Sequence, residues 1–450
     1  MTVYLHDIPL EEAKRRFSSA LESAGLDLIL GEEIIPLDEN ALGRVVSRPV
    51  WAKLSSPHYH ASAMDGFAVK RVDTVGAAPN NPLILVCKHD NEAPTALYLD
   101  TGDALPEWAD AVIPIENVEP LDEKDLPADD PRNPFAIRIR SSVTPWQNIR
   151  PMGEDMIATQ LVIPAGQTLR PVDLGAIAGC GHADVWVAKK PRVAILPTGT
   201  ELVSIGTPVK PGDIIEYNSM VLAAQVKSWG GEAYRFPITS DNLKAICERL
   251  NEAAEQADLI LLNAGSSAGS EDFSATAIQS LGEVLVHGIA VRPGHPVILG
   301  MIVRHKKTFA EQSDMVPVIG VPGFPVSTAL TAEIFVEPLL ARWQGRKPID
   351  PEIISAQLTR KITSPAGDDD YLRVVVGRVG EKMLAAPLSR GSGVITSLVR
   401  ADGIALIPRG SQGMEAGTQI QIRLYRTRQD LESSIFAIGS HDMTDRKSVV

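Results

Sequence analysis

Cysteine is scarce in this sequence, and the three residues present, Cys87, Cys180 and Cys247, are widely separated. None of them belongs to a CxxC motif or to a cysteine–histidine pair with the spacing of zinc ligands. The sequence therefore indicates neither a disulfide framework nor a structural zinc site. We interpret the three cysteines as buried free thiols.

Long apolar runs and an excess of positive charge are also missing. No segment offers the roughly 18 uninterrupted apolar residues that a membrane-spanning helix requires, and Met1–Leu10 lacks the pattern of a signal peptide. The formal net charge is -13, whereas a nucleic-acid-binding surface needs a basic excess to neutralise phosphates. We therefore expect a cytoplasmic protein without membrane or nucleic-acid partners. A local basic pocket for a small anion is compatible with this composition.

A chain of 450 residues is too long for a single hydrophobic core and indicates about two to four domains. Apolar residues at three-to-four spacing predict a helix over residues 8–30. From Pro49 to about Trp146, short apolar runs are broken by Pro, Gly, Asn and Asp, which is typical of a β lobe. In this lobe we expect strands at residues 83–86, 111–113 and 136–139, and an acidic loop between Glu119 and Pro134.

Strands and helices alternate from Pro191 to about Trp343. The expected strands are residues 192–196, 259–262 and 316–321, and the expected helices are residues 219–229 and a segment capped by Asp241. Because these strands are apolar throughout, they predict a mostly parallel sheet with helices on both faces. After Gly345 the alternation of apolar and polar residues predicts β structure again, at residues 358–362, 372–376 and 420–424.

These patterns predict a multidomain chain of the α/β plus β class. The expected parts are an N-terminal helical and linker domain (1–50 and 145–185), a β lobe (51–144), an α/β domain (186–345), a C-terminal β domain (346–427) and the start of a truncated further domain (428–450). We also hypothesise that Asp445–Val450 is not native, because it matches one frame of a common synthetic sequencing adapter.

Glycine-rich turns after the strands of the α/β domain are the first candidates for a ligand site, since ligands of open α/β sheets bind beyond the carboxyl ends of the strands. Three such turns are Pro197–Glu201, Asn263–Asp272 and Val321–Pro325. Small residues let backbone N–H groups approach a phosphate at a helix N-terminus. Carboxylates such as Glu201 and Asp272 can hold Mg²⁺ that binds the phosphate. Tight turns with capping acids explain the pattern equally well.

Two further segments contain candidate functional residues, but neither segment alone indicates a function. Arg292–Pro296 places positive donors in a loop restricted by proline, which also fits a plain turn. Ser62–Val69 places Asp65 between Met and Gly at the start of a strand, where a carboxylate suits a metal or hydroxyl contact or an ordinary Asp-Gly turn. We interpret the nearby His58 and His60 as surface residues.

From about residue 8 to about residue 426, ordered motifs closely resemble the molybdopterin molybdenumtransferase family, which includes bacterial MoeA and the E domain of gephyrin. The motifs are Ser62–Val69; Thr101-Gly102 with Leu105-Pro106 and Ala109–Val112; Asn148–Arg150 with Gly153–Asp155; Pro197–Leu202; and Pro293-Gly294 through Pro322-Gly323. Their order and spacing carry the resemblance.

The resemblance implies an elongated homodimer with a β lobe, a molybdopterin-binding three-layer α/β domain and a C-terminal β-barrel-like domain. It also implies Mg²⁺-dependent insertion of molybdate into adenylylated molybdopterin, with release of AMP. By motif, Asp65, Glu201 and Asp272 would be catalytic, and Glu201, Asp241 and Asp272 would hold the metal. The ligand-binding residues implied are Thr101, Asp155, Gly265, Ser266, Ser267, Gly269, Arg292, His295, Pro322 and Gly323. The family assembles its cleft from both subunits.

Three loops depart from the family pattern. The Gly-Gly-Val-Ser-Val-Gly loop is Ala264–Gly269 here, and the two lysines of Lys-Pro-Gly-Lys-Pro are Arg292 and His295. Arginine keeps the charge and adds a planar fork, whereas histidine replaces a fixed cation. Phe324 replaces the amide of Pro-Gly-Asn-Pro. The alternative is therefore a non-catalytic molybdopterin- or oxyanion-binding sensor or carrier. Ile438–Asp442 resembles the start of the periplasmic-binding-protein-like domain fused to some members.

Overall fold

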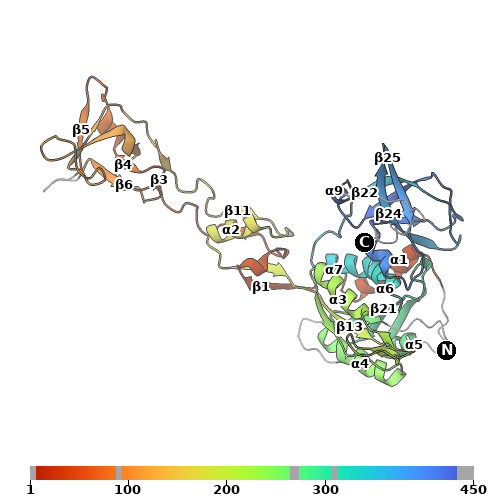
Figure 1. The fold of residues 1–450 in the computed structure, drawn as a ribbon. Coiled ribbons are helices and arrows are strands. Elements are labelled where there is room, and N and C mark those ends of the chain that lie inside the picture. The colour runs from red at the N-terminus through yellow and green to blue at the C-terminus, as the bar shows by residue number, and fades with distance from the viewer. Residues whose placement is uncertain (1–6, 88–93, 264–272, 306–312, 433–450) are drawn as a thin grey trace. The chain divides into compact units, whose positions relative to one another are not determined.

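The computed structural model describes residues 7–87, 94–263, 273–305 and 313–432 (Figure 1). The chain divides into two compact units. Unit 1 combines Met1–Glu33 with Ala188–Val450, and unit 2 is the continuous segment Ile34–Val187. Unit 2 is therefore inserted into the sequence of unit 1.

Two three-stranded antiparallel sheets form the β lobe of unit 2. Their strand orders are β6 (Ala96–Leu99), β4 (Gly66–Val69), β7 (Ala111–Pro114), and β5 (Leu83–Val86), β9 (Ala136–Ile139), β8 (Val118–Leu121). Buried side chains such as Phe67, Ile113 and Ile137 make its core. The three predicted strands are confirmed. The prediction of an acidic loop from Glu119 to Pro134 is wrong for its first residues, because residues 119–121 belong to β8 and pair with β9.

The rest of unit 2 consists of short pairings and one helix. The paired strands are β2 (Val50–Trp51) with β11 (Leu161–Ile163), β3 (Ala61–Ser62) with β10 (Ile149–Arg150), and β1 (Glu32–Pro36) with β12 (Asp184–Ala188); short 3-10 helices cover Glu39–Ala41, Arg71–Thr74 and Ile115–Asn117. Helix α2 (Pro171–Gly179) begins with proline, and the Asp173 carboxylate accepts a hydrogen bond from the Arg170 backbone N–H at 2.8 Å. The Arg170 guanidinium lowers the pKa of Asp173 to about 2.

A six-stranded sheet forms the α/β core of unit 1. Its order is β16 (Glu232–Arg235), β13 (Arg192–Pro197), β17 (Leu259–Asn263), β21 (Met315–Val321), β20 (Ile298–Val303), β18 (Gly282–His287). The first four strands are parallel to one another, and β20 is antiparallel to them. The edge strand β18 is antiparallel to β20 and therefore runs in the same direction as the first four. One face packs against α1 (Leu10–Ser23), α3 (Asn218–Ser228), α6 (Pro325–Thr331), the π-helix Ala332–Val336 and α7 (Glu337–Trp343); the other packs against α4 (Leu243–Gln256) and α5 (Phe273–Leu281). The predicted sheet, mostly parallel and covered on both faces, is confirmed.

Two details of this core differ from the sequence predictions. The N-cap of α4 is Asn242 and not Asp241, because the Asn242 side chain accepts from the Ala245 N–H at 2.9 Å, the donor that a capping residue must reach. The apolar face of α1, including Leu10 and Phe17, packs in the α/β core. Helix α1 therefore belongs with unit 1, whereas the prediction from sequence grouped residues 1–50 with residues 145–185.

A closed five-stranded barrel completes unit 1, as the resemblance implied. Its strands, in order around the barrel, are β24 (Asp369–Val379), β25 (Lys382–Pro387), β22 (Ile353–Leu358), β28 (Gln419–Leu424) and β26 (Gly403–Ile407), which pairs again with β24. Smaller elements are β14 (Leu202–Val203), β15 (Ile214–Ile215), β19 (Val291–Arg292), β23 (Ile362–Thr363), β27 (Gly413–Met414), α8 (Thr396–Val399) and α9 (Arg428–Glu432). The predicted strand at 358–362 is wrong in its middle, since β22 ends at Leu358 and β23 begins at Ile362.

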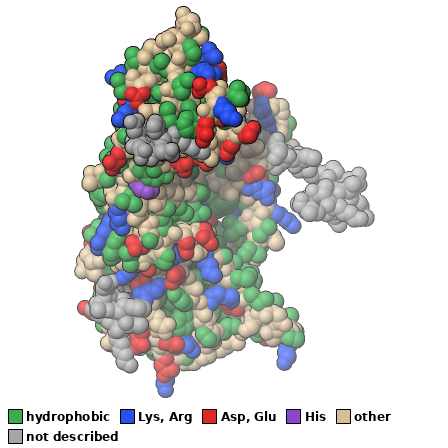
Figure 2. Space-filling model, turned by 90° about the vertical axis from the view of Figure 1, so that its left-hand side faces the viewer, with side chains coloured by type: hydrophobic (Ala, Val, Ile, Leu, Met, Phe, Trp, Pro, Cys, Tyr) green, Lys and Arg blue, Asp and Glu red, His purple; other side chains and the backbone are tan. Residues whose placement is uncertain are grey.

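The surface charges agree with the composition, and the cysteines agree with the sequence prediction only in part. On the face drawn in Figure 2, Lys and Arg side chains are interspersed with Asp and Glu side chains. Within the described ranges, no helix has both the length and the apolar character needed to cross a membrane. All three cysteines are free; Cys180 is buried, whereas Cys87 and Cys247 are half-buried, so the expectation of buried thiols is confirmed only for Cys180.

Replacing Trp343 with phenylalanine tests how α1 is attached to the α/β core. The buried indole N–H of Trp343 donates to the Leu26 carbonyl at 2.7 Å. Trp343→Phe leaves that carbonyl without its donor, and we expect the free energy of unfolding of unit 1 to fall by about 1–3 kcal/mol. Urea unfolding followed by circular dichroism measures the change. Trp51→Phe, at a side chain 52% exposed, should change stability by less than about 0.5 kcal/mol, and equal losses would contradict this account.

Candidate functional site

In unit 2, Asp65 and Thr101 form a hydrogen-bonded pair. One carboxylate oxygen of Asp65 accepts from the Thr101 backbone N–H at 2.8 Å and from its hydroxyl at 2.7 Å. These two hydrogen bonds lower the pKa of Asp65. Gly66 follows Asp65 into β4, and a Cβ there would lie 2.1 Å from the Ile113 carbonyl oxygen. Only glycine therefore lets β4 pair closely with β7 directly after the carboxylate.

Asp155 lies on a separate loop of unit 2. Its backbone N–H donates to the Ser56 carbonyl at 2.9 Å, and its side chain is exposed. Among the described side chains, no hydrogen bond joins Asp155 to Asp65. His60 is half-buried and accepts from the Met152 N–H through Nδ1 at 2.9 Å, so it helps to hold this loop and is not a plain surface residue. His58 is exposed, as expected.

In unit 1, a cavity of about 250 Å³ lies at the carboxyl ends of the parallel strands, lined by residues of the turns Pro197–Glu201 and Val321–Pro325 and by Asn263. Thr198 follows β13, Asn263 ends β17 and Gly323 follows β21. The Thr198 N–H donates to the Asn263 carbonyl at 2.9 Å, which joins two of these strand ends. Glu201, half-buried, also lines this cavity. The structure thus brings Glu201 and Gly323 together in unit 1.

Glu216 is a buried carboxylate in the same cavity that the sequence analysis missed. It accepts from the Ser219 backbone N–H at 2.7 Å and from the Ser219 hydroxyl at 2.6 Å, and so holds the start of α3. Asn218 donates to the Gly323 carbonyl at 2.7 Å, which fixes α3 to the turn after β21. An acid three residues before a serine at the start of a predicted helix is a signal that could have identified it.

A second cavity of about 790 Å³ adjoins the turn after β21 and is lined by residues of the α/β core and of the barrel. Its cationic side chains include Arg292, Arg373 and Arg390. Arg373 is 2% exposed, and its guanidinium donates to the Ser397 hydroxyl at 3.0 Å and to the Ser389 carbonyl at 2.6 Å. Burial lowers the pKa of both Arg373 and Arg390. Within the part of the chain that the structure describes, no carboxylate pairs with Arg373.

The other charges of this cavity, which we call the arginine cavity, are paired within the protein. Arg292 contacts Asp368 at 2.6 Å and donates to Nε2 of His295 at 3.2 Å, while Nδ1 of His295 lies 3.1 Å from Asp7. The guanidinium of Arg390 donates to the buried Asp370. The structure therefore places the predicted residues Arg292, His295 and Pro322 along one cavity.

Sequence reasoning missed Arg373 and Arg390, because both come from the barrel. Arg373 lies within β24, and Arg390 follows β25. Parallel pairing of β19 with β24, with Arg292 opposite Asp370, brings these segments to the Arg292 loop. A single arginine in an alternating strand carries no local signal that it faces a cavity between two domains.

Of the three predicted metal ligands, the structure describes Glu201 and Asp241 but not Asp272. Asp241 is exposed, just before α4. Asp272 and the loop residues Gly265, Ser266, Ser267 and Gly269 lie outside the described residues. Among the residues that are described, no group of three or more His, Cys, Asp or Glu side chains could hold a metal ion. Glu201 and Asn263 offer oxygen donors in one cavity, a set that fits Mg²⁺ because this ion keeps several waters and needs few protein ligands.

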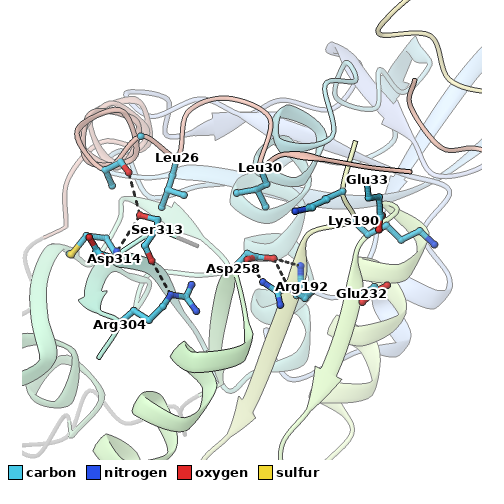
Figure 3. Close-up of a pocket in the computed structure, with 14 residues that line it drawn as sticks. Leu26, Leu30, Glu33, Lys190, Arg192, Glu232, Asp258, Arg304, Ser313 and Asp314 are labelled. Carbon is cyan, nitrogen blue, oxygen red and sulfur yellow. Dashed lines mark hydrogen bonds and ion pairs between the residues drawn. The ribbon is translucent and has the colours of Figure 1, made fainter. Parts of the chain in front are cut away.

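A third cavity, of about 560 Å³, lies at the opposite edge of the sheet, where β13 and β21 begin (Figure 3). Asp258 accepts from the Arg192 backbone N–H at 2.9 Å and from its guanidinium at 2.8 Å. Arg304 donates to the carbonyls of Ser313 and Ala257, each at 2.9 Å. None of the predicted site residues lines this cavity.

Three family profiles match the chain in order. Residues 8–181 match the MoeA N-terminal region (domain I and II), residues 194–342 match the "Probable molybdopterin binding domain", and residues 355–425 match the MoeA C-terminal region (domain IV). Molybdopterin molybdenumtransferase 2 of Mycobacterium tuberculosis is 33% identical over 410 residues, covering 86% of this chain and 94% of the relative. The chain belongs to the MoeA family of molybdopterin molybdenumtransferases.

Further relatives agree with this assignment. The molybdopterin molybdenumtransferase of Bacillus subtilis is 28% identical over 437 residues, covering 94% of this chain and 96% of the relative. A crystal structure of the molybdopterin biosynthesis MoeA protein from Pyrococcus horikoshii has a TM-score of 0.71 and 29% identity, covering 94% of this chain and 100% of that chain. The MoeA resemblance and the multidomain MoeA-like fold with its C-terminal barrel are confirmed, and the family is one of transferases in molybdenum cofactor biosynthesis.

Replacing Thr101 tests whether its hydroxyl group lowers the pKa of Asp65. In Thr101→Val, Asp65 loses its hydroxyl donor and keeps the backbone N–H, so the pKa of Asp65 should rise towards its ordinary value. Titration of the Asp65 carboxyl by ¹³C NMR measures this pKa. In Thr101→Ser, which keeps a hydroxyl, the pKa should stay low. An unchanged pKa in the valine variant would show that the hydroxyl does not stabilise the carboxylate.

Proposed function

We propose that this chain inserts molybdate into adenylylated molybdopterin in a Mg²⁺-dependent reaction that releases AMP. The observation that carries the proposal is Arg373, a buried cation whose guanidinium contacts only neutral oxygens in the described part of the chain. A buried charge without a counter-charge is costly, and an oxyanion in the arginine cavity would supply that counter-charge. Guanidinium groups bind tetrahedral oxyanions through paired N–H donors.

The other residues of the arginine cavity would bind and orient the substrates. Arg292 and His295 would contact molybdate or the phosphate of the pterin, exchanging part of their contact with Asp368 and Asp7. Pro322 and Gly323 would support the ligand from the turn after β21. The backbone N–H groups of the loop Gly265, Ser266, Ser267 and Gly269 are proposed from the family motif to hold a phosphate.

The carboxylates would act on the leaving group. Glu201 would hold Mg²⁺ with the Asn263 oxygen and water, and Asp241 and Asp272 are proposed as further ligands from the family motif. When bound, Mg²⁺ lowers the charge on the departing AMP. Asp65, kept ionised by Thr101, is proposed as a catalytic carboxylate, and Asp155 as a ligand-binding one.

A non-catalytic sensor or carrier of molybdopterin or an oxyanion is the second candidate. The observation that favours it is the internal pairing of the arginine cavity. Arg292 lies 2.6 Å from Asp368, and His295 lies 3.1 Å from Asp7, so both side chains already have carboxylate partners before an anion enters. Such a site would bind the pterin without advancing the reaction.

An AMP-release assay tests the proposal. Purified protein is mixed with adenylylated molybdopterin, Mg²⁺ and micromolar molybdate, with tungstate in parallel. We expect AMP release that depends on the oxyanion and on Mg²⁺. If the folded protein binds the pterin tightly but releases no AMP, the result would contradict the enzymatic function and support the sensor or carrier function.

Glu201→Gln tests the role of the carboxylate. We expect AMP release to fall by about a hundredfold, while pterin affinity, measured by fluorescence titration, stays within about threefold. Glu248→Gln, an exposed acid on α4 with a side chain 68% exposed, is the matched control and should keep full activity. Equal loss of binding and turnover in Glu201→Gln would contradict the assigned role.

We also propose that the active cleft needs two copies of this chain. Asp65 belongs to unit 2, whereas Glu201 belongs to unit 1, and the family completes its cleft across a dimer. Mixing inactive Asp65→Asn and Glu201→Gln chains under conditions that allow subunit exchange should restore about a quarter of the wild-type AMP release, because half of the dimers would contain one intact cleft. Absence of any recovery in demonstrably mixed dimers would mean that one subunit supplies both residues.

A further inference from the structure

Phe324 is an apolar side chain left in water beside two polar cavities. Its side chain is 46% exposed although it follows the turn after β21, at the centre of the candidate site. It lines both the arginine cavity and the cavity that contains Glu201. A half-exposed phenyl ring loses the stabilisation that burial would give, so its position favours a ligand that covers it.

The backbone around Phe324 is held from both sides. The Phe324 carbonyl accepts from the Thr328 N–H at 2.9 Å and from the Thr328 hydroxyl at 3.0 Å. The preceding Gly323 carbonyl accepts from Asn218 at 2.7 Å, and Pro325 begins α6. The ring therefore belongs to a pre-organised turn, which lowers the entropy lost when a ligand binds.

A glycine lies against the ring. A Cβ at Gly393 would lie 3.5 Å from Cδ1 and 3.7 Å from Cε1 of Phe324. Gly393 lines the Glu201 cavity, and its neighbour Ser392 lines the arginine cavity. The Ser392 carbonyl accepts from the Val326 N–H at 3.1 Å, which fixes this segment beside the start of α6. Space beside the ring is therefore built into the barrel segment.

The chemistry of the two cavities identifies the group that would cover the ring. If molybdate binds among the arginines, the dithiolene that receives it must point into the arginine cavity. If Glu201 acts at the phosphoanhydride, that group must lie at the smaller cavity. Both groups are carried by one pyran ring fused to the pterin, so the pyranopterin lies between the two cavities, where Phe324 is. The pyrimidinone ring of a pterin is planar and aromatic, and such rings stack favourably on aromatic side chains.

We propose that Phe324 is a specificity-determining residue that stacks on the aromatic pyrimidinone ring of the pyranopterin substrate; the inference rests on the proposed function for the direction of the ligand. In this chain a ring contact takes the place of the hydrogen bond that an amide would offer at this position. Phe324 positions the substrate and takes no part in proton or group transfer.

Four variants test the proposal. Phe324→Leu keeps an apolar side chain and removes the π-face, and should raise the Kd for molybdopterin and the KM for the adenylylated pterin about tenfold, with kcat within about threefold. Phe324→Trp should keep both constants within about threefold of wild type. Gly393→Leu places a side chain beside the ring and should weaken pterin binding. Leu406→Ala, at a barrel residue 47% exposed that lines neither cavity, should behave as wild type.

Two readouts separate this proposal from the proposed function. The Kd for tungstate, measured by calorimetry without pterin, should be unchanged in Phe324→Leu, and the stacking-induced quenching of pterin fluorescence should be lost in that variant and kept in Phe324→Trp. Wild-type AMP release with an unchanged Kd and KM in Phe324→Leu would overturn the stacking proposal alone. Absence of AMP release by the wild-type protein, together with weaker pterin binding by Phe324→Leu, would overturn the proposed enzymatic function. The stacking role of Phe324 would still be supported.

Discussion

The short parallel pairing of β19 with β24 is the constraint on which the arginine cavity depends. β19 belongs to the loop that follows the α/β sheet strand β18, and β24 is a barrel strand, so this pairing joins the two hydrophobic cores. The Asp369 N–H donates to the Ala290 carbonyl at 2.9 Å within the same junction. An ion pair between Glu333 of the π-helix and Arg423 of β28 joins the two cores at a second point. Together these contacts bring Arg292 of the α/β loop to the same cavity as Arg373 of the barrel.

Burial and charge act together in this cavity. Asp370 is almost fully buried and holds Arg390, and Asp368 holds Arg292, so these arginines are positioned by carboxylates. Arg373 is positioned instead by a hydroxyl and two carbonyl groups, which orient the guanidinium and leave its charge in place. Because such a charge in a low-dielectric setting attracts anions strongly, the neutral partners of Arg373 determine where an oxyanion would be bound most firmly. The apolar ring of Phe324 limits that polar region on one side.

Sequence patterns predicted those parts of the molecule that are encoded locally. Apolar strands such as Leu259–Asn263 and the turns after them were recognisable, because the carboxyl ends of parallel strands converge whatever the rest of the chain does. The Asp65 motif was recognisable by family resemblance, and the structure adds the hydrogen bond between Asp65 and Thr101. Arg373, Arg390 and Glu216 were not predicted, since each acts through residues far away in the sequence or through a cap at a helix start. The cap of α4 was misplaced by one residue, because Asp241 and Asn242 are both good capping residues and only backbone geometry distinguishes them.

The insertion of unit 2 after Glu33 has a consequence for biosynthesis. Helix α1 leaves the ribosome early, but its partners in the core, such as Val193 and Trp343, are translated only after the whole of unit 2. Chains are made at about 5–20 residues per second and complete domains tend to fold as they emerge, so unit 2, a continuous segment, can reach its native contacts first. Until residue 188 and the following strands appear, the apolar face of α1 has no native surface to cover it. The nascent chain must therefore keep that helix soluble, and the half-buried Glu12 with its two more exposed arginine partners helps to do so.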